Sequence, residues 1–151
     1  MERKCFWLLL AMTVTLLSVS SAAAHCEVPC GIYDDEMRAD MIAEHATTIE
    51  KAMSQISELS AKTPVNHNQL VRWVTNKEHH ATEIQHIVSQ YFLTQRIKPD
   101  ADQYGKKLQL LHHMLLSAMK CKQTTEPSNV NKLRSLLKEF EVLYFGHSHR
   151  K

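Results

Sequence analysis

The segment His25-Cys26-Glu27-Val28-Pro29-Cys30 places an imidazole and two thiols within a few residues of one another. It directly follows Ala22-Ala23-Ala24, the small residues that end an apolar leader. A cut after Ala24 would make His25 the first residue and would add a free α-amine to the same segment. Thiolates and neutral imidazoles bind transition metals. The segment therefore predicts a metal site that proteolysis completes, and it points to redox chemistry.

The donor groups of this segment favour a planar metal site. After the cut, the amine of His25 and the amide nitrogen of Cys26 are backbone neighbours that can close a five-membered chelate ring. The thiolates of Cys26 and Cys30 complete a set of two nitrogens and two sulfurs, and the His25 imidazole remains as an axial fifth ligand. Planar nitrogen-rich sites suit Ni(II) or Cu(II), whereas zinc takes tetrahedral sites. Because a chelating amine–amide pair resists tetrahedral geometry, nickel or copper is favoured.

Residues 1–24 have the three parts of a secretory signal peptide. Arg3 and Lys4 supply the charge, residues 6–17 are almost wholly apolar, and the last part is small and ends in alanines. The alternative is a membrane anchor, but the apolar run is shorter than the roughly 20 residues of a spanning helix. We expect cleavage after Ala24, although the small residues just before it also suit a peptidase. The chain would then enter the secretory pathway and be secreted or held in an organelle lumen.

The composition limits the partners and the fold of the mature chain. Removal of 24 from 151 residues leaves 127, which suits one domain. Lys and Arg number 18 against 16 Asp and Glu. This near balance, without a basic stripe, argues against nucleic acid as a partner, and no membrane contact is expected once the leader is removed. Glycine and proline are scarce, at 3 and 4 residues, which favours an all-helical domain.

The cysteines leave two chemical states open. Of the 4 cysteines, Cys5 lies in the leader, so Cys26, Cys30 and Cys121 remain in the mature chain. Three cysteines are too few for a disulfide scaffold, although an exported protein meets oxidising conditions. Cys26 and Cys30 therefore form a disulfide, a metal-bound dithiolate, or each at a different stage. Cys121 is expected to be a buried or free thiol without a catalytic role.

Four amphipathic segments follow the metal-binding segment. Their apolar residues, Met37, Val71, Val74 and Met119 among them, recur at steps of three and four, as on one face of a helix. The expected helices run from Asp34 or Asp35 to about Ser60, from Asn66 to about Gln95, from about Asp102 to Lys120, and from about Asn129 to Phe145. Short connections between them predict an all-α, up-down-up-down four-helix bundle. The chain is thus divided into a signal peptide (1–24), a hook (25–34) and the bundle (35–151).

The middle of the second expected helix is unusually polar. Asn76–Glu83 has almost no apolar content over two turns. One interpretation is a solvated stretch, and the other is a polar contact surface toward the hook or another subunit. His79, His80 and Glu83 are candidates for partners of the axial imidazole on the second interpretation.

The pattern His-Cys-x-x-Pro-Cys-Gly-x-Tyr at a processed N-terminus resembles the nickel hook of nickel-containing superoxide dismutases. In this chain it reads His25, Cys26, Pro29, Cys30, Gly31 and Tyr33. The resemblance implies a four-helix bundle that assembles as a homohexamer and binds one nickel ion per subunit. It also implies that superoxide is disproportionated to O2 and H2O2 by cycling between Ni(II) and Ni(III).

The resemblance further implies which groups bind the metal. The ligands would be the amine and imidazole of His25, the amide nitrogen and thiolate of Cys26, and the thiolate of Cys30. Tyr33 matches the family tyrosine beside the open face of the metal, which makes it the candidate catalytic residue. Two features depart from the family: Glu27 stands where members often have aspartate, and an export signal replaces the short propeptide of bacterial members.

Two other functions use parts of the same pattern. A secreted, non-enzymatic helical bundle or a metal carrier with a Cys26–Cys30 disulfide explains the leader and the helices, but leaves His25, Pro29 and Tyr33 without a reason. A ferritin-like di-metal bundle would use Glu83-x-x-His86. Such a centre needs a second motif of this kind and two more glutamates, and the sequence contains no second motif.

Overall fold

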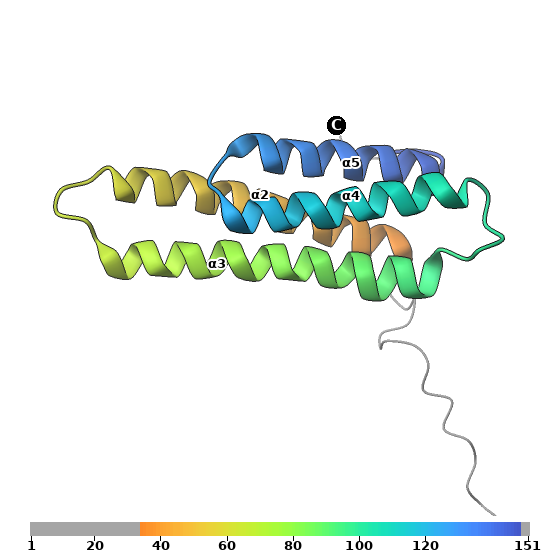
Figure 1. The fold of residues 1–151 in the computed structure, drawn as a ribbon, viewed down its shortest axis with the longest axis horizontal. Coiled ribbons are helices and arrows are strands. Elements are labelled where there is room, and N and C mark those ends of the chain that lie inside the picture. The colour runs from red at the N-terminus through yellow and green to blue at the C-terminus, as the bar shows by residue number, and fades with distance from the viewer. Residues whose placement is uncertain (1–33, 149–151) are drawn as a thin grey trace, which may run out of the picture.

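The computed structural model describes residues 34–148, which form four long helices and no strand. They are α2 (Asp34–Ser60), α3 (His67–His86), which continues directly into the π-helix η1 (Ile87–Arg96), α4 (Tyr104–Gln123) and α5 (Pro127–Phe145). Consecutive helices run in opposite directions (Figure 1). Within the described part of the chain, the up-down-up-down bundle expected from the sequence is therefore confirmed.

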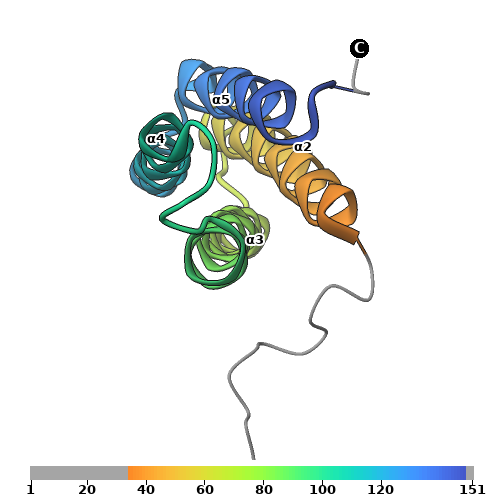
Figure 2. The ribbon, with the colours of Figure 1, turned by 90° about the vertical axis from the view of Figure 1, so that its right-hand side faces the viewer.

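The helices α2 and α3 extend beyond the other pair at one end of the bundle. Their connection projects past the connection between α4 and α5 (Figure 1). At the opposite end α2 begins, η1 ends and α5 ends, as Figure 2 shows. Because the hook precedes α2 in sequence, this second end is where the chain passes from the hook into the bundle.

The core consists of apolar side chains from all four helices, because each helix turns one stripe of such residues inward. Phe92 of η1 and Phe140 of α5 are fully buried and meet edge to face, with ring centroids 5.0 Å apart. The ring of Tyr144 stacks on Phe140 at 5.2 Å. The other large, fully buried apolar side chains are Ile42, Ile49, Met53, Ile84, Val88, Leu110, Leu111, Met114 and Leu133.

Some apolar residues expected on the inner faces are exposed. Met37 is 48% exposed, Val71 63%, Val74 39% and Met119 38%. Steps of three or four residues fit a stripe wider than the actual contact surface, so residues at the margin of each stripe face outward. Val71 and Val74 also lie near the start of α3, and the α2–α3 connection just before it projects past the connection between α4 and α5 (Figure 1).

Local signals explain most of the helix boundaries. Asn66 caps α3 as expected, because its side chain accepts a hydrogen bond of 3.2 Å from the amide of Gln69. Gly146 ends α5 with a φ of 81°, the left-handed conformation that glycine adopts at little cost. The third helix begins at Tyr104, later than expected, because Gln103 has a φ of 51°. The fourth begins earlier, at Pro127, since proline suits the first helical position.

The sequence predicts an ordinary α-helix up to about Gln95, and here the structure differs. Residues Ile87–Arg96 form a π-helix, whose hydrogen bonds join residues five apart. A side-chain hydrogen bond also joins residues five apart, since Thr94 Oγ1 donates to the carbonyl of Ser89 at 2.7 Å. In an α-helix, residues five apart point about 140° away from each other. In η1 residues five apart lie on nearly the same face. This brings the side chains of Tyr91 and Arg96 together.

None of the helices in residues 34–148 is long and apolar enough to span a membrane.

Candidate metal centre

The expected metal ligands His25, Cys26 and Cys30, and the expected catalytic residue Tyr33, lie outside the residues that the structure describes. The first described residue is Asp34, which directly follows Tyr33. The structure shows the part of the bundle that directly follows the hook in sequence. We call this part the platform: the first turn of α2 and the elements that contact it.

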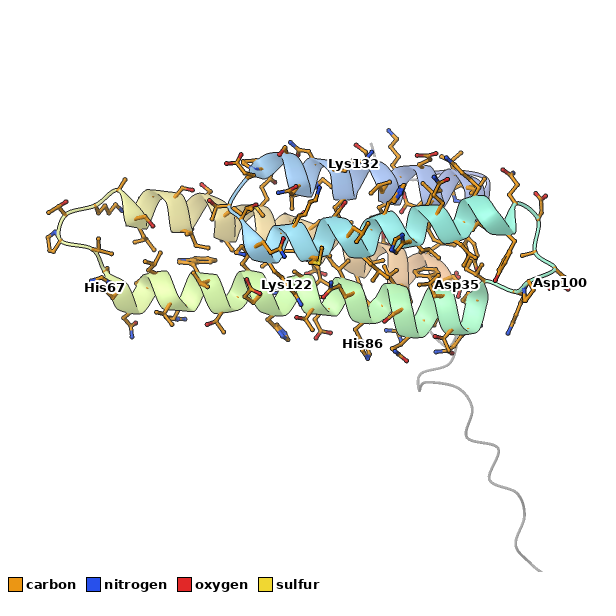
Figure 3. The ribbon with its side chains drawn as sticks, in the orientation of Figure 1. Asp35, His67, His86, Asp100, Lys122 and Lys132 are labelled. Carbon is orange, nitrogen blue, oxygen red and sulfur yellow. The ribbon has the colours of Figure 1, made fainter. Side chains whose placement is uncertain are left out.

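Asp35 is the centre of a polar cluster at this end of the bundle (Figure 3). Its Oδ1 accepts hydrogen bonds from the Tyr91 hydroxyl at 2.5 Å and from Arg96 Nε at 2.8 Å. Its Oδ2 accepts one from the Tyr144 hydroxyl at 2.7 Å. Arg96 also donates from Nη2 to the Tyr91 oxygen at 2.8 Å. We call these four residues the Asp35 cluster; it joins the beginning of α2 to the ends of η1 and α5.

Burial and hydrogen bonding raise the pKa values of three groups in the Asp35 cluster. Burial raises the pKa of the Tyr144 hydroxyl, and the hydrogen bond to Asp35 raises it further. The same two causes raise the pKa of Tyr91. The hydrogen bond to Tyr91 raises the pKa of Arg96 above its already high value. Two neutral phenols and a guanidinium thus donate to one carboxylate, and charge-assisted bonds of this kind are the stronger ones.

Cations also lie over the tyrosine rings of the cluster. The guanidinium carbon of Arg38 is 4.9 Å from the centroid of the Tyr91 ring, and that of Arg96 is 4.7 Å from it. Lys107 Nζ is 5.6 Å from the centroid of the Tyr144 ring. Such cation–π contacts add modestly to the orientation of both rings.

The C-terminal end of the described chain folds back onto the same platform. His147 Nε2 lies 3.2 Å from Glu36 Oε1 in the first turn of α2. Ser148 donates a hydrogen bond of 3.0 Å to Glu141, whose side chain is fully buried. The first turn of α2 is thus bonded to η1, to α5 and to the segment after α5.

The polar stretch Asn76–Glu83 is not simply solvated. Lys77 is only 3% exposed, and its ammonium donates to the carbonyls of Cys121, at 2.6 Å, and Lys122 at the C-terminal end of α4. His80 is half-buried against α2, where its Nδ1 lies 2.8 Å from Nδ1 of His45. Much of this stretch therefore makes helix-to-helix contacts inside the bundle.

The other two candidate partners of the axial imidazole, His79 and Glu83, do not take part in the contact between His80 and His45. His79 is exposed, with its Nδ1 3.9 Å from Glu83 Oε1. Whether His79, His80 or Glu83 contacts His25 involves a residue outside the described range, so this stays a prediction. In residues 34–148 no three His, Cys, Asp or Glu side chains are grouped so as to hold a metal ion.

Cys121 lies in the core, as expected. Its side chain is fully buried, and burial raises the pKa of the thiol to about 11. A thiol with such a pKa is protonated at neutral pH and reacts poorly.

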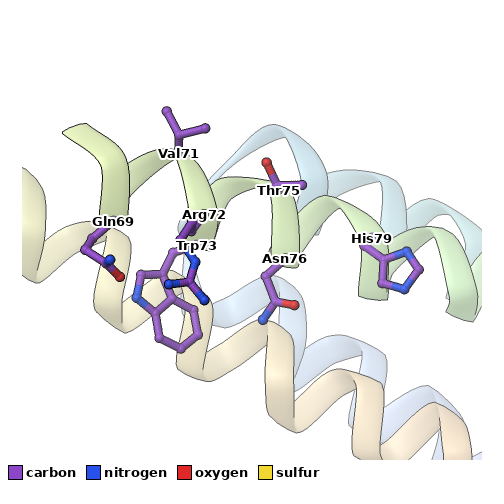
Figure 4. Close-up of a pocket in the computed structure, with 7 residues that line it drawn as sticks. All are labelled: Gln69, Val71, Arg72, Trp73, Thr75, Asn76 and His79. Atoms are coloured by element: carbon purple, nitrogen blue, oxygen red, sulfur yellow. The ribbon is translucent and has the colours of Figure 1, made fainter. Parts of the chain in front are cut away.

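A pocket of about 530 Å³ is lined by residues of the first part of α3 (Figure 4). Trp73, Arg72 and His79 are among the residues that line it. This part of α3 belongs to the half nearer His67, away from the end that carries Asp35 (Figure 3). The pocket is therefore not part of the platform next to the hook.

Sequence reasoning missed the Asp35 cluster. Tyr91 lies in the second expected helix and is only 2% exposed. Its hydroxyl group was the available signal, since a buried tyrosine usually has a hydrogen-bond partner. Nothing in the sequence paired it with Arg96, because the helix was expected to be an ordinary α-helix.

The fold and platform define an antiparallel helical bundle with a thiol-rich segment directly before its first helix. The sequence model of the family described as nickel-containing superoxide dismutase matches residues 20–148, which include that segment and all four helices. The chain belongs to this family, whose members are oxidoreductases that act on superoxide. No curated protein matches the chain significantly, and no solved structure does so either.

Proposed function

We propose that the mature chain disproportionates superoxide to O2 and H2O2 with one nickel ion per subunit, held by the N-terminal hook. The observation that carries the proposal is the family match over residues 20–148, which includes the donor-rich segment as well as the bundle. A likeness confined to the bundle would say little about chemistry, because one fold supports many functions.

The donor set of the hook suits nickel. The amine and imidazole of His25, the amide nitrogen and thiolate of Cys26 and the thiolate of Cys30 would hold the ion, and nitrogen and thiolate donors suit nickel. When bound, nickel would supply the one-electron exchange between its +2 and +3 states. Cleavage after Ala24 is part of this proposal, because the amine of His25 does not exist in the uncut chain.

The bundle holds in place the helical turn that follows the hook in sequence. The Asp35 carboxylate accepts hydrogen bonds from Tyr91, Arg96 and Tyr144, so the first turn of α2 cannot shift without breaking them. Tyr33 lies two residues before Asp35, within the reach of this constraint. We infer that the Asp35 cluster fixes the direction in which the chain extends from the start of α2 toward Tyr33 and the metal-binding residues. Tyr33 would order the small anion and shield the sulfurs from solvent.

We further propose export through the leader and assembly as a homohexamer. The leader in residues 1–24 has the three parts of a signal peptide, so the protein would act outside the cell or in an organelle lumen. The homohexamer is what the resemblance of the hook pattern to the family implies.

Nickel content and dismutase activity of the processed chain test the proposal together. We expect about one nickel per chain and turnover well above that of free nickel. Cys30→Ser should lower both to background, because it removes one of the two thiolates. The matched control is Cys121→Ala, which removes a buried thiol outside the hook and should leave nickel and turnover unchanged.

Three outcomes would decide against this function. Nickel bound at one per chain without turnover would favour the metal carrier. Turnover that survives in Cys30→Ser would show that the hook is not the active site. Zinc in place of nickel in the purified chain would contradict the planar donor set.

A further inference from the structure

The side chains of His45 and His80 meet across the contact between α2 and α3. Their Nδ1 atoms are 2.8 Å apart, and the ring centroids are 5.0 Å apart with the planes tilted by 53°. These residues belong to the bundle and share nothing with the hook sequence. In the metal-free pair one Nδ1–H donates a hydrogen bond to the other Nδ1, so only one of the two Nδ1 atoms carries hydrogen.

The spacing of these nitrogens also suits two ligands of one metal ion. A bond from imidazole nitrogen to a first-row metal is about 2.0–2.1 Å long. Two such bonds at a right angle place the nitrogens about 3 Å apart. The pair in the structure is within a few tenths of an ångström of that separation. Because the rings come from different helices, the packing of α2 on α3 holds them in place before any ion binds.

The surroundings favour a cation at this position. Glu44 on α2 and Glu83 on α3 both act electrostatically on the pair, and His79 is the neighbouring titratable group. Burial, followed by the neighbouring His80, lowers the pKa of His45. Burial and His79 lower the pKa of His80. Both rings are therefore neutral at neutral pH, and neutral imidazole is the form that binds metal.

We propose that His45 and His80 form a second transition-metal site, in which one divalent ion joins α2 to α3. The described residues offer no third protein ligand there, so water or a small molecule would fill the other coordination positions. Imidazole donors suit copper, nickel and zinc, and do not suit magnesium or calcium. The proposal does not depend on the hook or on dismutase activity.

The test uses the full mature chain with the hook disabled by His25→Ala, Cys26→Ser and Cys30→Ser. We expect this chain to bind one equivalent of Cu(II), with an electron paramagnetic resonance spectrum that shows nitrogen ligands. Adding His80→Gln should weaken that binding at least tenfold, because the amide can hydrogen-bond to His45 but is a poor ligand. Adding His112→Ala and His113→Ala instead should change nothing, since these two exposed histidines lie next to each other on α4, whereas the pair joins α2 to α3.

Thermal unfolding with Zn(II) gives an independent measurement. An ion that binds only the folded chain raises its melting temperature. Zinc should raise that of the hook-disabled chain and leave that of the His80→Gln chain unchanged. If the hook-disabled chain binds no copper, or keeps its copper and its zinc response with His80→Gln in place, the pair is a hydrogen-bonded helix contact only and the proposal is wrong.

Discussion

Arg96 donates a hydrogen bond of 2.8 Å to the phenol oxygen of Tyr91, five residues earlier in the same helix. This contact requires the π-helical turn of η1, since an α-helix would point the two side chains about 140° apart. With both on one face, they bond to the same carboxylate oxygen of Asp35. π-helical segments are often found at functional sites, and this one supports the turn that follows the hook.

Asp35→Asn should destabilise the protein more than an exposed ion pair would suggest. The substitution keeps the shape of the side chain but removes the charge from a carboxylate with three donors, two of them phenols. Hydrogen bonds to charged groups contribute about 1.5–3 kcal/mol each, and we expect a loss of about 2–3 kcal/mol in the free energy of unfolding. Urea unfolding measures it.

The matched control for Asp35→Asn is Glu50→Gln. Glu50 pairs with Arg134 at 2.9 Å, but both side chains are more than a third exposed. Exposed pairs contribute at most about 1 kcal/mol. Equal losses in the two variants would contradict a special role for the Asp35 cluster.

The stability of the protein should fall above pH 10, and Tyr144 should account for part of the fall. Burial and Asp35 raise the pKa of Tyr144 above 10.0, its value in an unfolded chain. Above that pH the unfolded chain loses the phenol proton while the folded chain keeps it, so stability falls as pH rises. Urea unfolding from pH 9 to 11 should show a shallower fall in Tyr144→Phe.

Tyr104→Phe serves as the control for this pH dependence, because Tyr104 lies outside the Asp35 cluster. Its stability curve should stay parallel to that of the unaltered protein. Identical slopes for Tyr144→Phe and the unaltered protein would contradict the raised pKa.

Lys77→Met should lower the free energy of unfolding by about 1–3 kcal/mol, the cost of leaving buried acceptors without a donor. The methionine matches the length of lysine but cannot donate to the carbonyls of Cys121 and Lys122 at the end of α4. Lys106→Met is the control, since Lys106 forms an exposed pair with Glu139 at 2.8 Å. Denaturant unfolding of both variants decides the matter, and a loss confined to Lys106→Met would overturn this account of Lys77.

An alanine left in front of His25 should abolish nickel binding in the proposed geometry. The extra residue moves the free amine away from the Cys26 amide and removes one of the five donors. We expect nickel content and turnover near background, with unchanged helical circular dichroism. Removing the alanine with an aminopeptidase should restore both, and a fully active extended chain would exclude the amine as a ligand.

The sequence by itself determined the fold class and the family. Apolar residues at helical spacing predicted four helices, since burial of one face is a local property of each segment. The hook pattern from His25 to Tyr33 led to the nickel family because its donors are adjacent in the chain. Asn66 marked the start of the second helix, since its side chain can cap the first turn.

Only the tertiary structure decided which distant residues meet. Tyr144 and Asp35 are 109 positions apart in the chain, and His45 and His80 are 35 apart. The periodicity of one helix does not fix its rotation against the next, and it contains no sign of the π-helical turn in η1. These depend on how four helices share one core, so the Asp35 cluster and the histidine pair appeared only once the helices were packed together.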